Sequence, residues 1–133
     1  MIFGVGTDIL KLNRMRSGIL QESDPFVRRT FTEKERKEAA KREDPREYFA
    51  GRFAAKEAVY KSLRVSPELV DLSEIEVLTE SSGAPRVILH GRLLSYKNQL
   101  GIRKVHVSIS YEEEIVTAFA VAETCGDIKQ TVE

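Results

Sequence analysis

The chain has 133 residues, 41% of them hydrophobic, which is the length of one domain with a modest core. Its 21 lysines and arginines balance its 21 aspartates and glutamates, so no net charge favours nucleic acid or an anionic membrane as a partner. The single cysteine, Cys125, excludes an internal disulfide framework, and no apolar run is long enough to span a bilayer. We therefore expect a soluble protein of the cytoplasm.

The first predicted element is a strand, because residues 1–10 (MIFGVGTDIL) are mostly apolar or β-branched. Alternation places Asp8 on the same face as Gly4 and Gly6. We expect this face to leave open space beside a carboxylate, which a ligand could fill. A short helix that is basic at its start is predicted to follow, over NRMRSGILQE.

Two further helices are predicted in the first half of the chain. Thr32 and Glu35 form a capping box that begins a highly charged surface helix, FTEKERKEAAKR. Asp44 as N-cap and Pro45 at the first helical position begin the longest and most buried helix, which runs to Leu63. A short helical turn is expected from Ser66.

The second half predicts two β-hairpins with a helix between them. EIEVLTE and RVILHG read as strands joined by the turn SSGAP, and RLLSYKNQL is an amphipathic helix closed by Gly101. KVHVSIS and IVTAFAVAE alternate as strands around an acidic turn. The order β-ααα-ββ-α-ββ predicts an α+β fold, with helices packed on one side of a mostly antiparallel sheet. We expect a single domain over 1–124 and a tail over 125–133.

The long helix carries Arg52, Lys56, Glu57 and Lys61 in one short run. A Glu57–Lys61 surface pair, which would contribute about 0.2–0.5 kcal/mol, explains part of this run without any function. However, aromatic and alanine residues leave little of the helix exposed, and a carboxylate there needs a partner. Asp8 poses the same problem on the neighbouring strand. Mg²⁺ removes the conflict, since it takes one or two carboxylates together with substrate phosphate oxygens, and the nearby cations match phosphate charge.

Four motifs then occur in a characteristic order: GVGTDIL, FAAKEAVYKSL, SSGAP and VHVSIS. Together they resemble the holo-acyl-carrier-protein synthase family of phosphopantetheinyl transferases, from Ile2 to about Glu123. The resemblance implies a 4′-phosphopantetheinyl transferase-like fold. It also implies an enzyme that moves the 4′-phosphopantetheine arm of coenzyme A onto a serine of apo acyl carrier protein, releasing adenosine 3′,5′-bisphosphate.

The resemblance also implies roles for individual residues. Asp8 and Glu57 would ligate Mg²⁺ and Lys61 would stabilise the displaced phosphate, which makes these three the catalytic candidates. The general base stays open between Glu57 and a metal-bound hydroxide. The residues implied to contact coenzyme A are Arg52, Lys56, Lys61, Gly83, Pro85, Ser110 and Tyr111. The alternatives without a function are that Arg52 and Lys56 are surface residues with buried stems, and that SSGAP is a plain hairpin turn.

Tyr111 stands where the family often has a histidine. A phenol donates a hydrogen bond but carries no positive charge, so the resemblance is weakest at this position. The docking candidates for an acidic carrier protein are Arg14, Arg16 and Arg28, which would mainly steer association. The resemblance further implies a homotrimer with active sites at subunit boundaries. Two alternatives remain open, a Mg²⁺-dependent nucleotide pyrophosphohydrolase and an inactive carrier-protein-binding module.

Overall fold

The computed structural model describes residues 1–15 and 23–125. Strands β1 (Ile2–Lys11), β5 (Ile115–Thr124) and β4 (Ile102–Glu112) form an antiparallel sheet in that order. Strands β2 (Ile75–Thr79) and β3 (Pro85–Leu89) form a separate hairpin. The predicted α+β class and antiparallel pairing are confirmed, but the strands make two sheets and not one.

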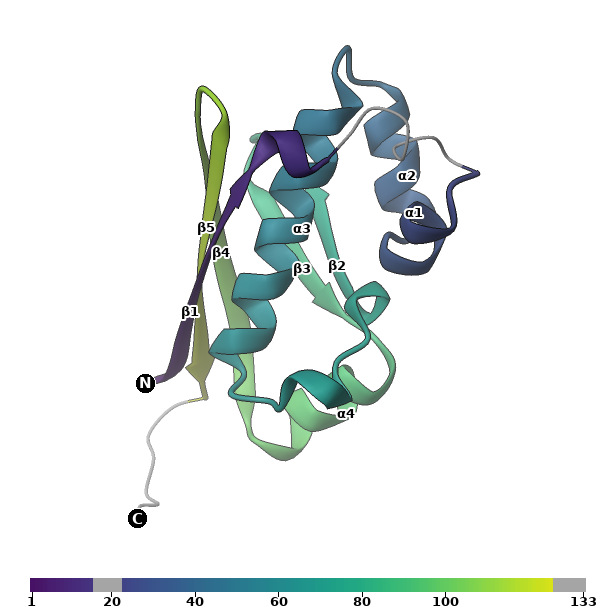
Figure 1. Cartoon of the computed structure of the whole chain (residues 1–133). Coiled ribbons are helices and arrows are strands. Elements are labelled where there is room, and N and C mark those ends of the chain that lie inside the picture. The colour runs from purple at the N-terminus through teal and green to yellow at the C-terminus, as the bar shows by residue number, and fades with distance from the viewer. Residues whose placement is uncertain (16–22, 126–133) are drawn as a thin grey trace.

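The helices are α1 (Pro25–Thr30), α2 (Glu33–Ala40), α3 (Pro45–Ser62) and α4 (Gly91–Gln99), with short 3-10 turns at Leu12–Arg14, Pro67–Leu69 and Leu72–Glu74. The long helix α3 lies between the three-stranded sheet and the β2–β3 hairpin (Figure 1). No helix among the described residues is long and apolar enough to cross a membrane.

The predicted helix order is confirmed except near residue 20. Of the helix expected over 13–22, only the turn Leu12–Arg14 is seen, and residues 16–22 lie outside the described residues. The helix α1 that follows was not predicted. Its N-cap Asp24 accepts a hydrogen bond from Phe26 N, and Pro25 occupies the first turn. The predicted tail likewise lies outside the described residues, apart from Cys125.

Glycines bring β1 and α3 into backbone contact. A Cβ atom added at Gly6 would lie 2.8 Å from Lys61 Cβ and from Ser62 N, and closer still to the Ala58 carbonyl oxygen. The space predicted to be open beside Asp8 is therefore filled by α3, so that prediction is wrong. The same close approach sets Asp8 against the C-terminal half of the helix.

Candidate active site

Asp8 of β1 and Lys61 of α3 meet at the junction of strand and helix. Lys61 Nζ donates a hydrogen bond to the Thr7 carbonyl oxygen at 3.0 Å and lies 3.5 Å from Asp8 Oδ1. The Asp8 side chain is 18% exposed. Burial raises the pKa of Asp8, and the Lys61 charge opposes that rise.

Glu57 faces the same junction. Burial and then the nearby Asp8 charge raise the pKa of Glu57, while Lys61 opposes both effects. The Asp8 charge acts on Glu57, so the two carboxylates lie near each other in the fold, although they are far apart in sequence. The structure therefore brings together the three predicted catalytic residues Asp8, Glu57 and Lys61.

Tyr60 is a neighbour of this cluster to which sequence reasoning gave no role. Its hydroxyl shares a hydrogen bond with Glu57, which lowers the pKa of the carboxyl, and burial and then the Glu57 charge raise the pKa of Tyr60. The sequence signal that could have identified Tyr60 was its spacing from Glu57, because residues three apart share one helix face.

The cluster has the charge pattern of a site for one hard cation. Two carboxylates and one ammonium leave a formal charge of −1 in a partly buried place. Among the described residues no three His, Cys, Asp or Glu side chains gather as a closed metal site. Magnesium, however, needs only one or two protein carboxylates when water and substrate phosphate supply its other ligands. Two carboxylates at one strand–helix junction, with Lys61 3.5 Å from Asp8 Oδ1, fit such an ion.

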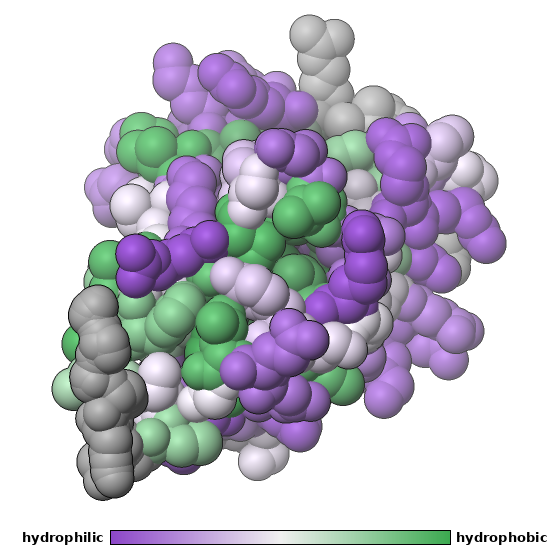
Figure 2. Space-filling model, turned by 90° about the horizontal axis from the view of Figure 1, so that it is seen from below, coloured by the Kyte–Doolittle hydropathy of each residue, from purple (hydrophilic) through white to green (hydrophobic). Residues whose placement is uncertain are grey.

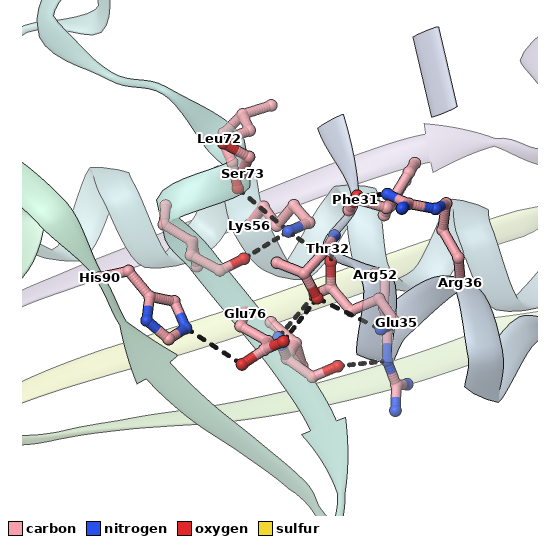
Figure 3. A network of polar contacts seen from close by, with 12 residues as sticks. Phe31, Thr32, Glu35, Arg36, Arg52, Lys56, Leu72, Ser73, Glu76 and His90 are labelled. Atoms are coloured by element: carbon pink, nitrogen blue, oxygen red, sulfur yellow. Dashed lines mark hydrogen bonds and ion pairs between the residues drawn. The ribbon is translucent and has the colours of Figure 1, made fainter. Parts of the chain in front are cut away.

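Lys56 occupies a different place from the one expected. Its side chain is fully buried on the flank of α3 that faces α2 and β2, where its ammonium lies 2.9 Å from Glu35 Oε1 (Figure 3). It also donates to the carbonyl oxygens of Leu72, at 3.0 Å, and Ile75. An ammonium has three hydrogens to donate, and these three oxygens take them all.

Full burial excludes the alternative of Lys56 as a surface residue, and a phosphate contact by Lys56 stays a prediction. The partner Glu35 is equally buried and also accepts hydrogen bonds from Thr32 N at 2.9 Å and Val77 N at 2.7 Å. Burial raises the pKa of Glu35 and lowers that of Lys56, and the attraction between them opposes both shifts. This pair ties α2, α3 and β2 together.

Arg52, one turn before Lys56, points to the same flank. Its Nε donates to the Val77 carbonyl at 3.1 Å, and its terminal nitrogen donates to Thr79 Oγ1 at 2.6 Å and contacts Glu38 at 3.5 Å. The guanidinium also lies 4.4 Å from the centre of the Tyr48 ring. Only 6% of the residue is exposed, so these contacts explain Arg52 as a link between α3 and β2. A phosphate contact by Arg52 stays a prediction.

Gly83 and Pro85 lie at the tip of the β2–β3 hairpin. Gly83 has a φ of +94°, a left-handed conformation that glycine adopts without strain. A hollow of about 350 Å³ beside the tip is lined by β3 and β4 residues, including Pro85, Lys104 and His106. Because β3 contacts β4, which is the edge of the sheet opposite β1, this loop is separate from the Asp8 cluster within one chain.

Ser110 and Tyr111 lie near the end of β4. The predicted alternation of this strand is confirmed, with Ser110 exposed and Val105 buried. The Tyr111 hydroxyl rests against Gly51 of α3, where any added Cβ would collide with it. Burial raises the pKa of Tyr111, and the positive charge of Arg52 opposes that rise. The predicted contacts of Ser110 and Tyr111 with coenzyme A stay predictions.

The predicted docking residues are exposed where the structure describes them. Arg14 ends the first 3-10 turn, and Arg28 lies on α1. Arg16 lies outside the described residues. Both described arginines are thus accessible to an acidic partner.

Comparison with known proteins identifies the family. Residues 4–120 match the model of the 4′-phosphopantetheinyl transferase superfamily. A holo-[acyl-carrier-protein] synthase of Natranaerobius thermophilus is 38% identical over 121 residues, which cover 91% of this chain and 97% of that protein.

Solved structures agree with these sequence matches. The holo-[acyl-carrier-protein] synthase of Neisseria meningitidis superposes with a TM-score of 0.82 at 33% identity, covering 93% of this chain and all of that one. A Bacillus anthracis holo-(acyl-carrier-protein) synthase, solved in complex with CoA (3′,5′-ADP), superposes with a TM-score of 0.75 at 35% identity. The match covers 93% of this chain and 98% of that one. The chain therefore belongs to the 4′-phosphopantetheinyl transferase superfamily.

Proposed function

We propose that this enzyme transfers 4′-phosphopantetheine from coenzyme A to a serine hydroxyl of an apo acyl carrier protein. The serine oxygen forms a bond to the β-phosphorus, the phosphoanhydride bond breaks, and adenosine 3′,5′-bisphosphate leaves. The convergence of Asp8, Glu57 and Lys61 carries the proposal, because these are the charges that the chemistry of a diphosphate needs. Coenzyme A bound to a solved relative supports the choice of cosubstrate.

In this proposal Asp8 and Glu57 would hold Mg²⁺, and the ion would neutralise phosphate charge. Lys61 is fixed by the Thr7 carbonyl at 3.0 Å and is 44% exposed, so its ammonium can also reach the phosphate being displaced. Tyr60 orients the Glu57 carboxylate through their shared hydrogen bond. Glu57 would accept the serine proton unless the bound ion supplies the base, and the choice between these two stays open.

A second copy of the chain would complete the site. The outer face of the β1-β5-β4 sheet exposes Val5 by 54%, Ile9 by 68% and Phe119 by 50%, an apolar surface that suits burial in an oligomer. The Gly83 loop, separate from Asp8 within one chain, would then act in a neighbour's site. We propose a homotrimer, and Phe119→Lys should convert it to smaller species in light scattering. A wild-type protein that is monomeric at micromolar concentration would contradict this assembly.

The exposed Arg14 and Arg28 would receive the acidic helix of the carrier protein and speed its association. A free cysteine, Cys125, suits a reducing compartment, and we propose that the enzyme acts in the cytoplasm.

The test is to incubate the protein with coenzyme A, Mg²⁺ and apo carrier protein, and to weigh the carrier by mass spectrometry. A phosphopantetheine mass gain is expected, together with its loss in Asp8→Asn or in EDTA. Hydrolysis of coenzyme A without transfer would favour the pyrophosphohydrolase. An unchanged carrier and intact coenzyme under all conditions would favour the inactive binding module.

A further inference from the structure

A hollow of about 210 Å³ lies at the end of the molecule where α3 finishes. Figure 2 looks at this end and shows apolar surface lying between hydrophilic side chains. The hollow is formed by the segment after α3, the 3-10 turn at Pro67–Leu69 and α4. Its lining residues are Arg64, Val65, Ser66, Leu69, Arg92, Leu93 and Tyr96.

The lining combines apolar walls with two guanidinium groups. Neither Arg64 nor Arg92 pairs with a carboxylate of the described residues within 4.0 Å, and the Arg64 guanidinium instead lies 5.5 Å from the centre of the Phe3 ring. The first amides of α4 add no positive potential, because Glu74 accepts from Arg92 N and Leu93 N at 3.3 Å each. The positive charge therefore comes from the side chains, and a short apolar group with an anionic end would match this lining.

The hollow lies within reach of the candidate active site. Lys61 lies beside Gly6, and the Arg64 side chain lies beside Gly4, where an added Cβ would be 3.2 Å from Arg64 Cγ. From Asp8 back to Gly4 is about four residues of strand, or roughly 13 Å. The pantetheine arm has about thirteen bonds from phosphorus to sulfur, equivalent to about four residues and about 15 Å when extended. An arm that runs along β1 from a diphosphate at Asp8 towards Gly4 would thus bring the sulfur level with Arg64.

We infer that this hollow receives the acyl group of a coenzyme A thioester and that Arg64 and Arg92 select acyl groups ending in a carboxylate. The inference rests on the proposed transfer. The volume of about 210 Å³ equals about seven waters, which is enough for a short acyl chain. The bond changes at phosphorus are those of coenzyme A itself, and the thioester passes unchanged to the carrier.

The test compares the kcat/KM for transfer from coenzyme A, butyryl-CoA and succinyl-CoA, two thioesters of similar length that differ in the terminal carboxylate. We expect wild type to prefer succinyl-CoA over butyryl-CoA by about tenfold, as a charge-assisted contact allows. Arg92→Gln should lower this preference to about threefold, and Arg64→Gln with Arg92→Gln should remove it. In both variants the kcat/KM for transfer from coenzyme A itself should change less than twofold. Lys97→Gln, on α4 but outside the hollow, is the matched control.

Calorimetric binding of succinyl-CoA and butyryl-CoA without carrier gives a second readout that does not need transfer. Equal rates and equal affinities for the two thioesters in wild type would overturn the inference, as would a preference that survives in the double variant. Either result would leave the proposed function standing. Failure of every coenzyme to react would instead defeat the proposed function, and the binding preference would still decide the role of the hollow. Should Arg64→Gln unfold the chain, Arg92→Gln alone decides.

Discussion

Replacing Lys56 with methionine distinguishes a structural role for this lysine from a phosphate contact. The ammonium is fully buried and bonded to Glu35 Oε1 at 2.9 Å, to the Leu72 carbonyl at 3.0 Å and to the Ile75 carbonyl. Methionine would fill most of the volume but leave the Glu35 carboxylate and two carbonyls without this partner. Breaking a buried ion pair by removing one member costs about 3–5 kcal/mol.

That loss is a large share of the stability of a domain, which is about 5–15 kcal/mol. At about 4 °C per kcal/mol for a chain of this size, the Tm of Lys56→Met should fall by about 12–20 °C. The assay is urea and thermal unfolding followed by circular dichroism. Adding Glu35→Gln removes the unpaired charge, so the double variant should recover part of the loss, with a coupling of about 1–3 kcal/mol.

Lys61→Met is the matched control, because Lys61 is 44% exposed and its ion pair contributes little to stability. Lys61→Met should keep the Tm within a few degrees and lose transfer activity. Lys56→Met, assayed well below its Tm, should keep a near-normal KM for coenzyme A. An unchanged urea midpoint with a raised KM for coenzyme A would refute the reasoning.

Three other changes test the remaining contacts. Gly6→Ala places a methyl group against the α3 backbone and should cost about 1–3 kcal/mol and slow transfer; an unchanged Tm would count against the backbone contact. Burial raises the pKa of Glu38, but hydrogen bonds from Thr79 and Tyr48 outweigh it, so the pKa is lowered and the folded state binds fewer protons. The stabilisation by Glu38 is therefore present above the ordinary carboxyl pKa and is lost as pH falls through the lowered value. In Glu38→Gln the free energy of unfolding should fall less steeply with acid below about pH 5. The same pH dependence in the variant and the wild type would contradict this assignment. Arg14→Glu should raise the KM for the carrier more than that for coenzyme A, with the gap closing in high salt, and equal effects on both would argue against docking there.

The alternation of apolar and polar residues predicted which face of a strand each side chain occupies, but not which strands pair with each other. Alternation placed Val105 inward and Ser110 outward, as the structure has them. Periodicity does not specify which strand edges pair, so the separation of β2 and β3 from the other strands was not foreseen. Likewise, the Asp24–Pro25 start signal of α1 was present, but six residues are too few for a helical period to stand out.

The candidate site was predicted through its carboxylates, while the buried pair was missed. Glu35 was read as one half of a surface capping box, and it does accept from Thr32 N. The same carboxylate also receives Lys56 and Val77 N in the core, contacts that depend on how α2 and β2 meet α3. Sequence spacing shows which residues share a helix flank, but not which flank is covered.

The four charges of α3 between residues 52 and 61 divide into two pairs at helical spacing. Arg52 and Lys56 face α2 and β2, whereas Glu57 and Lys61 face β1. Residues 56 and 57 differ by about 100° around the helix axis, so fixing one direction fixes the other. The three oxygens that hold Lys56 therefore also set the rotation of α3 that points Glu57 at Asp8. The buried ion pair thus favours one rotation of α3, and the close packing of Gly6 against Ala58 and Ser62 keeps that rotation when Lys56 is replaced.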